Sequence, residues 1–335
     1  MAPLIAAVTI GGFTILHAVI LWFLPGLTRR DVYFAVTVAP EFRNLPDGRA
    51  ILHRYRIELA AFSALAFAAS FAGVQQLGIA FMPLGLVLLR AGSFAGFYRA
   101  RQRVMRYAVA PTTIREADLG RRDRGVPGGS VLALGPFLPI AACAALLWMR
   151  GKEAAAGLYF ASAAGSLAAL TILRYGIDHW ARCIHATGPE LAKEMRFRRT
   201  ASVFLLVAEY LIAAQCTWIG LMPHHRGSNA GIVIAEFAGL LILALTAVLM
   251  LARMGQGGSR LAASSGNAEP VGDRTEDRYW RLGLLYFNRD DAAVVVERRF
   301  GLGYTLNFAR METWVMVALI IAGPVIRVLG LRLHG

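Results

Sequence analysis

Long apolar stretches alternate with shorter polar segments along most of this chain. Eight of these stretches have about the length, roughly 20 residues, that a helix needs to cross a ~30 Å hydrocarbon core. The pattern therefore predicts an all-α polytopic membrane protein with about eight transmembrane helices. The predicted spans are Leu4–Leu24, Ile57–Val74, Leu77–Phe97, Val131–Met149, Ala155–Leu173, Ala201–Met222, Ala230–Leu251 and Thr313–Leu329.

The composition agrees with this fold class. Hydrophobic residues make up 57% of the chain and charged residues 17%, whereas a soluble domain carries about 25% charged residues. So little charge argues against a soluble enzyme, a disordered chain and a secreted disulfide scaffold. The three cysteines, Cys143, Cys183 and Cys216, are isolated and lack the spacing of a zinc site. We therefore expect no bound metal and no cofactor.

The basic residues indicate the orientation of the spans. The chain has 35 Lys and Arg against 21 Asp and Glu, a net charge of +14. Of these basic residues, 29 fall in the segments that follow the first, third, fifth and seventh spans. By the positive-inside rule these loops are cytoplasmic and both termini lie outside. Because the basic runs adjoin the spans, we expect them to meet anionic lipid head groups and not nucleic acid.

The polar segments divide the chain into parts. Residues 1–253 form a predicted seven-helix membrane region with basic cytoplasmic loops. Residues 254–276 are rich in Gly, Ser and charge, and they predict a flexible linker. Residues 277–310, called here the C-terminal module, predict a small β-rich cytoplasmic unit that is a candidate surface for a cytoplasmic protein partner. Residues 311–335 hold the last span and an outer C-terminus.

Period-2 and β-branched patterns predict the strands of the module. The pattern predicts strands over Tyr279–Phe287 and Ala292–Arg298, and residues 288–291 predict the turn between them. The loop after the first span has a similar extended segment, Asp31–Val38. We hypothesise that this loop pairs with the module through these strands.

The module resembles a small uncharacterised bacterial domain with the pattern W-x-L-G-x-x-Y-x-N-x-x-D followed by V-x-x-R-x-G-x-G-x-T-x-N. That domain commonly follows multi-pass segments similar to the immunity protein for a sporulation-delaying toxin, which implies the bacterial inner membrane. The first loop also resembles these relatives, with Ala35 in place of their glycine. The matching motif residues are Trp280, Gly283, Tyr286, Asn288, Asp291, Arg299, Gly301, Gly303 and Asn307.

A few ionisable residues interrupt the spans, and an ionisable group inside a bilayer is costly unless it is paired or solvated. Depth along the helices places Glu236 level with Arg327, and Arg90 close enough to extend toward Glu58. Glu209 lies near the middle of the sixth span. Three interpretations stay open: structural ion pairs, a proton or ion relay that uses Glu209 and Glu236, and side chains that extend to the interface without a role.

No catalytic motif is present: the chain lacks a metalloprotease, P-loop, nucleophile-elbow or dinucleotide-binding pattern. We therefore expect a non-enzymatic membrane protein of the immunity, sensing or signalling type. The alternative is a proton-coupled small permease that uses Glu209 and Glu236.

Overall fold

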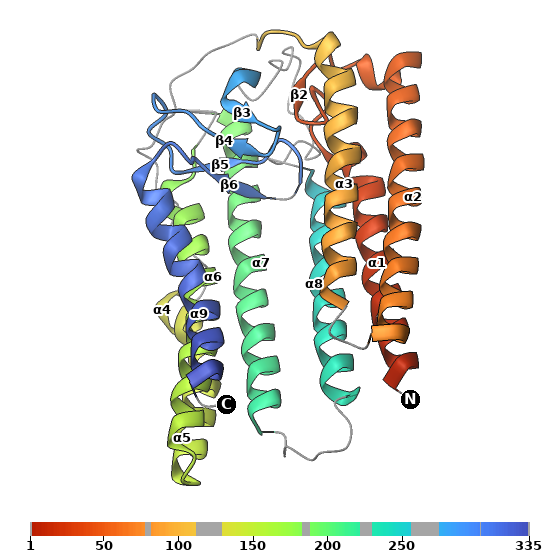
Figure 1. The fold of residues 1–335 in the computed structure, drawn as a ribbon. Coiled ribbons are helices and arrows are strands. Elements are labelled where there is room, and N and C mark those ends of the chain that lie inside the picture. The colour runs from red at the N-terminus through yellow and green to blue at the C-terminus, as the bar shows by residue number, and fades with distance from the viewer. Residues whose placement is uncertain are drawn as a thin grey trace. The chain divides into compact units, whose positions relative to one another are not determined.

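The structure is a computed structural model that describes residues 2–77, 82–111, 129–182, 188–221, 230–255, 275–301 and 303–333. It is mostly helical, with three small two-stranded antiparallel sheets. The chain divides into two compact units (Figure 1). The first comprises Met1–Glu116, Leu251–Tyr286 and Arg298–Gly303, and the second comprises Ala117–Met250, Phe287–Glu297 and Tyr304–Gly335. The C-terminal module therefore contributes residues to both units.

A helix occupies each of the eight predicted spans. The helices are α1 (Ala2–Leu27), α2 (Pro46–Leu77), α3 (Met82–Val104), α4 (Gly129–Leu134) with α5 (Phe137–Met149), α6 (Glu153–Trp180), α7 (Gly188–Leu221), α8 (Ala230–Met254) and α9 (Met311–Leu333).

Within the part of the chain that the structure describes, five helical segments are long and apolar enough to cross a membrane: Ile10–Leu27, Pro46–Gly73, Val131–Met149, Glu153–Trp180 and Leu191–Trp218. Shorter apolar stretches lie at Leu241–Met254 in α8 and Met311–Ala322 in α9. The predicted linker, 254–276, lies outside the described residues apart from its two ends.

In the first unit, α2 packs against both α1 and α3. Proline at the first position of α2 and Asp47 in its first turn suit a helix N-terminus, and basic residues occupy the last turn of α3. The core of this unit includes the loop between α1 and α2, where the Phe34 ring stacks on that of Phe300 and lies tilted against that of Phe97. Two short 3-10 turns, η1 (Phe42–Asn44) and η3 (Met105–Tyr107), border this core.

The loop after α1 is a hairpin and not the extended segment that the sequence predicts. Strand β1 (Val32–Tyr33) pairs with β2 (Val36–Thr37) through a two-residue turn. Both turn residues have positive φ, 47° at Phe34 and 62° at Ala35. This is the geometry of a type I′ turn, in which glycine is favoured. Ala35 therefore occupies a left-handed position, which a residue with a Cβ adopts less readily than glycine.

The predicted strand over Tyr279–Phe287 is also a hairpin. After the 3-10 turn η5 (Asp277–Tyr279), β3 (Trp280–Arg281) pairs with β4 (Leu285–Tyr286), and the chain reverses where Leu282 and Gly283 have positive φ. A continuous strand was the wrong prediction because the period-2 pattern continues through a left-handed turn that alternation alone does not reveal.

In the second unit, α6 packs against α5, α7 and α9 (Figure 1). Strand β5 (Val295–Glu297) lies within the strand predicted over Ala292–Arg298, and it pairs with β6 (Tyr304–Leu306). The turn predicted at residues 288–291 is confirmed: the Asn288 side chain accepts a hydrogen bond from the Asp290 amide. Within the first unit, β1 pairs with β2 and β3 with β4, so no described strand of the first loop pairs with β3 or β4, contrary to the hypothesis for that part of the module.

Candidate functional site

The first half of the module is built around Trp280 and Arg299. The Trp280 ring is buried, and its indole N–H donates to the Thr275 hydroxyl at 3.0 Å. The Arg299 guanidinium lies over this ring, 5.2 Å from its centroid, and donates to the Asp277 carboxylate and to Thr275. A cation held between an aromatic face and a carboxylate in a buried position is a strong structural contact. These two motif residues therefore hold the module together and do not face solvent.

Side chains attach this half of the module to the first loop and to α3. The Asp277 carboxylate accepts hydrogen bonds from the Thr37 amide at 3.3 Å and from its hydroxyl at 3.0 Å. Arg101 donates to the Ala35 carbonyl and, at 3.4 Å, to the Trp280 carbonyl. Burial lowers the pKa of Arg101, while the Asp277 carboxylate acts in the opposite direction. The loop and the module thus meet as the sequence led us to expect, but through side chains.

Two further motif residues complete this half. Tyr286 is fully buried, and its ring lies 5.0 Å from that of Trp280. Gly283 has a φ of 75°, and a Cβ atom there would lie 2.9 Å from Arg101 Cδ and 3.1 Å from Ala35 Cβ. Glycine is required at this position by both the backbone conformation and the close approach.

Asn307 is the centre of the second half. Its side-chain NH₂ donates to the carbonyls of Asn288 at 2.8 Å, Asp291 at 3.1 Å and Ala293 at 3.1 Å. Its side-chain oxygen accepts from the Asn288 amide at 3.1 Å, and its carbonyl accepts from the Thr313 hydroxyl at 2.7 Å. A single buried amide therefore fixes the turn, the entry to β5 and the first turn of α9.

The end of α6 is attached to β5. The Arg182 guanidinium donates to the Asp291 carboxylate at 3.0 Å, and the Arg182 amide donates to the Val295 carbonyl at 3.0 Å. Ala181 forms a parallel bridge with Val295. Gly176, one turn earlier on α6, allows close packing, since a Cβ atom there would lie 3.2 Å from the Val295 side chain.

A row of buried polar contacts continues from this attachment along α6 and α7, and we call it the polar seam. Arg198 on α7 donates to the Ala181 carbonyl at 2.7 Å. One turn further, the Ser202 hydroxyl donates to the Asp178 carboxylate at 3.0 Å. Deeper in the same helices, Arg174 donates to Glu209 through Nε at 3.1 Å and through Nη2 at 3.5 Å. The seam is thus a series of separate contacts between α6 and α7, from a buried carboxylate in a span-length helix to the end of α6 that is attached to β5.

Arg174 is one of the 29 basic residues counted in the segments after the spans, because the predicted fifth span ends at Leu173, but the structure places it within α6. The apolar stretch ends near Leu173, but α6 continues to Trp180, so Arg174 lies inside the helix. Its side chain is 7% exposed and that of Glu209 is not exposed at all. Of the interpretations left open for Glu209, the geometry fits the structural ion pair directly.

Of the other charged residues predicted to lie within the spans, the structure describes the side chains of Glu58 and Arg90 but not those of Glu236 and Arg327. Glu58 accepts from Arg99 and Arg103, each at 3.1 Å, and lies 3.6 Å from Arg54. Arg90, the partner expected from depth, is exposed and is not one of these three. The reason is that arginines at the end of α3 reach the same carboxylate without crossing the apolar region. The side chains of Glu236 and Arg327 lie outside the described part of the chain.

The remaining motif glycines lie in the loop between β5 and β6. Gly301 has a φ of 109° and Gly303 a φ of 72°, and both values are costly for residues with a Cβ. The Arg298 amide donates to the Gly303 carbonyl at 3.0 Å and closes this turn. The spacing of these two glycines in the motif is therefore a backbone requirement.

Comparison with known protein families gives one local match. Residues 289–314 match a family of unknown function (DUF5808). The matched segment begins just before Asp291, includes Arg299 and Asn307, and ends in the first turn of α9, whereas Trp280, Gly283 and Tyr286 precede it. No curated protein and no solved structure matches the chain.

Taken together, the module motif is mainly a set of internal contacts. Trp280, Arg299, Asp291 and Asn307 are recognisable in the sequence as motif residues, but the residues that bind them are not. Asp277, Thr37, Arg101 and Arg182 have no motif of their own, and only the fold brings them to the module. Among the described residues, no group of three or more His, Cys, Asp or Glu side chains is arranged to hold a metal.

Proposed function

We propose that this chain is a non-enzymatic membrane protein of the immunity, sensing or signalling type in the bacterial inner membrane. Eight helices would cross the bilayer, with the C-terminal module on the cytoplasmic face and both termini outside. The five long apolar helices and the placement of 29 basic residues on alternate loops support this topology. The module would then meet a cytoplasmic protein partner.

The polar seam is the observation that carries this proposal. Its three separate contacts, which start with the Arg174–Glu209 pair, lie along the same two helices, and the end of α6 forms a backbone bridge with Val295 in the module. An ion pair in a low-dielectric site is held strongly while both charges are present and is costly when one is lost. Any event that neutralises Glu209 or competes for Arg174 therefore alters the contact between α6 and α7 on which β5 rests.

The internal role of the module motif is consistent with signalling. The motif side chains make internal contacts that fix the shape of the module, as seen for Trp280, Arg299 and Asn307. A module of about 30 residues has too little core to fold without such attachment. A change in the helices to which the module is attached would therefore change the conformation of its outer surface. A partner protein would bind one of these conformations in preference to the other.

Hydrogen exchange on the full chain in detergent or nanodiscs tests this function. In the E209Q variant we expect faster amide exchange at β5 and at Arg182, while the helices keep their overall content by circular dichroism. The matched control is E58Q, which also removes a carboxylate from an arginine cluster but lies in the first unit, and it should leave β5 unchanged. S202A breaks the seam at its middle contact and should give the same effect on β5 if E209Q does not fold. Unchanged exchange at β5 in both seam variants would refute the proposal.

The alternative function is a proton-coupled small permease. The burial of the Glu209 carboxylate inside a span-length helix favours this candidate, because a proton carrier needs an acidic group at membrane depth. Transport would require Glu209 to leave Arg174 during each cycle, with Glu236 as the second carrier. Proton flux into liposomes containing the protein, abolished by E209Q without loss of fold, would favour the permease over the signalling protein.

A further inference from the structure

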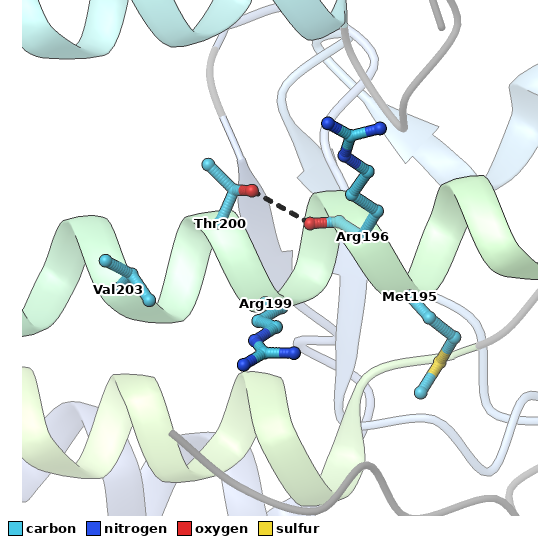
Figure 2. Close-up of a pocket in the computed structure, with 5 residues that line it drawn as sticks. All are labelled: Met195, Arg196, Arg199, Thr200 and Val203. Carbon is cyan, nitrogen blue, oxygen red and sulfur yellow. Dashed lines mark hydrogen bonds between the residues drawn. The ribbon is translucent and has the colours of Figure 1, made fainter. Parts of the chain in front are cut away.

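A shallow pocket of about 560 Å³ lies on the first half of α7. Figure 2 shows that two of its lining residues, Arg196 and Arg199, extend to opposite sides of the helix, while the Thr200 hydroxyl turns toward the Arg196 carbonyl. The polar groups of this pocket therefore do not converge on one ligand. Strained backbone, by contrast, is concentrated at one place, the contact between the first loop and the module.

All residues other than glycine that have positive φ in the described part of the chain lie in the turns of two hairpins. Phe34 and Ala35 form the turn between β1 and β2, and Leu282, with a φ of 54°, lies in the turn between β3 and β4. A left-handed backbone is costly for a residue with a Cβ, above all for a bulky one. The burial of the Phe34 ring offsets this cost, but the Leu282 side chain is 48% exposed and gains little from its own contacts. The conformation of Leu282 is therefore held by its surroundings.

The two turns pack against each other and are bridged by Arg101. A Cβ atom at Gly283 would lie 3.1 Å from Ala35 Cβ, so the two backbones approach closely. Arg101, which is buried in the last turn of α3, donates to the Ala35 carbonyl in one hairpin and, at 3.4 Å, to the Trp280 carbonyl in the other. One guanidinium group thus holds a carbonyl of each hairpin. Both hairpins and α3 belong to the first unit.

Asp277 provides the second connection. Its carboxylate accepts hydrogen bonds from the amide and the hydroxyl of Thr37 in β2, and from Arg299. Burial lowers the pKa of Arg101, Asp277 acts in the opposite direction by attraction, and Arg299 lowers the pKa further by repulsion. The closed contact therefore combines a few strong hydrogen bonds with backbone strain and like-charge repulsion, and the last two favour opening.

We propose that residues 32–37 and 280–286 form a strained latch, closed by Arg101 and Asp277, that opens as one unit and separates the module from the first loop. Opening breaks few hydrogen bonds and relaxes the strained turns, so it requires less free energy than the unfolding of α2 or α3. A protein that binds only the open form would shift the equilibrium toward it. The latch goes beyond the proposed function, because it lies wholly in the first unit and involves neither the polar seam nor the membrane placement.

Hydrogen exchange on the full chain in detergent tests the latch, with peptides that cover residues 32–38 and 280–286. Both peptides should exchange together, and faster than those of α2 and α3. We expect R101Q to accelerate exchange in both by about tenfold or more, because each hairpin loses a hydrogen bond to a charged group. T37V removes the hydroxyl that donates to Asp277 and should accelerate both by about fivefold. T37V decides the test if R101Q does not fold.

Relief of strain should have the opposite effect. L282G allows the left-handed backbone without steric cost and should slow exchange by about threefold, after the greater freedom of glycine in the open form is taken into account. The slowing should extend to residues 32–38, in the other hairpin. Slowing confined to residues 280–286 would mean that the two turns relax independently and would overturn the latch.

The matched control is R103Q. Arg103 lies at the same end of α3 but donates to Glu58 and not to a hairpin, so its loss should leave both peptides unchanged. Equal acceleration by R103Q and R101Q would indicate a general loosening of α3 and would overturn the latch. Exchange of both peptides at the rate of α2 and α3 would overturn it too, since the hairpins would then open only when the unit unfolds. Exchange at β5 reports on the polar seam separately, so a failure of the latch and a failure of the proposed function are distinguishable.

Discussion

Arg174 and Glu209 form a two-point ion pair between α6 and α7, with Nε–Oε1 at 3.1 Å and neither side chain more than 7% exposed. Removing one partner of a buried pair leaves an uncompensated charge, which costs about 3–5 kcal/mol. Replacing both partners by apolar residues of similar volume removes the charges together and is nearly neutral in many proteins. The pair is therefore expected to behave as a unit.

We accordingly predict that R174M and E209M each lower the free energy of unfolding by about 3 kcal/mol or more, and that R174M/E209M recovers most of this loss. Unfolding in a graded series of denaturing detergent mixtures measures all four proteins. Breaking the exposed pair of Arg278 with Glu276 by R278M serves as the control, since such surface pairs contribute about 1 kcal/mol or less. Strictly additive losses in the double variant would show that the two charges do not depend on each other.

The sequence is a reliable guide to the helices here because long apolar runs are a strong local signal. Each predicted span coincides with a helix among the described residues, and five of these helices are long and apolar enough to cross a membrane, but the predicted ends are misplaced because helices continue beyond their apolar part. Arg174 illustrates the consequence: the apolar stretch stops at Leu173 while α6 extends to Trp180. A buried arginine was thereby counted as a loop residue, and the partner of Glu209 could not be identified. Partner choice depends on which helices pack together, and no local pattern contains that information.

The two hairpins show a different limit. Positive φ at Phe34 and Ala35 is unusual for residues with side chains, so nothing in their identity predicts a turn. Gly283 did carry such a signal, and it occupies a left-handed position. The motif residues of the module were recognised in the sequence, but their role was not. Trp280 and Asn307 are buried, and their partners Thr275 and Thr313 lie five and six residues away without belonging to the motif.

Gly283 yields a second prediction, that G283A destabilises the protein by about 2 kcal/mol or more. The left-handed conformation costs a residue with a Cβ about 1 kcal/mol, and the new methyl group would in addition press on the buried Arg101 and Ala35 side chains. G303A is the matched control, because its φ of 72° is almost the same but no atom lies within 4 Å of the added Cβ. It should lose only the conformational part. Equal losses in thermal unfolding would mean that the close approach at Gly283 has no energetic weight.

Asn307 carries the third prediction. N307D keeps the size and the accepting oxygen but replaces the NH₂ group, which donates to three carbonyls, by a carboxylate oxygen that faces them. We expect a loss of about 3 kcal/mol or more, because acceptors are left unpaired beside a buried negative charge. Limited proteolysis after Arg289 or Arg310 should accelerate in parallel. D290N is the control: it exchanges the same two groups in the opposite direction at an exposed turn position, and should stay within about 0.5 kcal/mol of the wild type.

Tyr33 makes the stability of the first loop depend on alkaline pH. Burial raises the pKa of this phenol to about 12, against the opposing effect of Arg43, whereas an unfolded tyrosine has a pKa of about 10. The raised folded-state pKa means that the stabilisation is complete below pH 10 and is lost as pH rises from 10 to 12, by about 3 kcal/mol. Y33F gives up the hydrogen bond to the Gly48 carbonyl, about 1 kcal/mol near neutral pH, but cannot ionise. The free energy of unfolding of both proteins is measured by denaturation from pH 8 to 12. Y33F should be the less stable protein at pH 8 and the more stable one near pH 12. Parallel curves for the two proteins would show that Tyr33 does not titrate in this range.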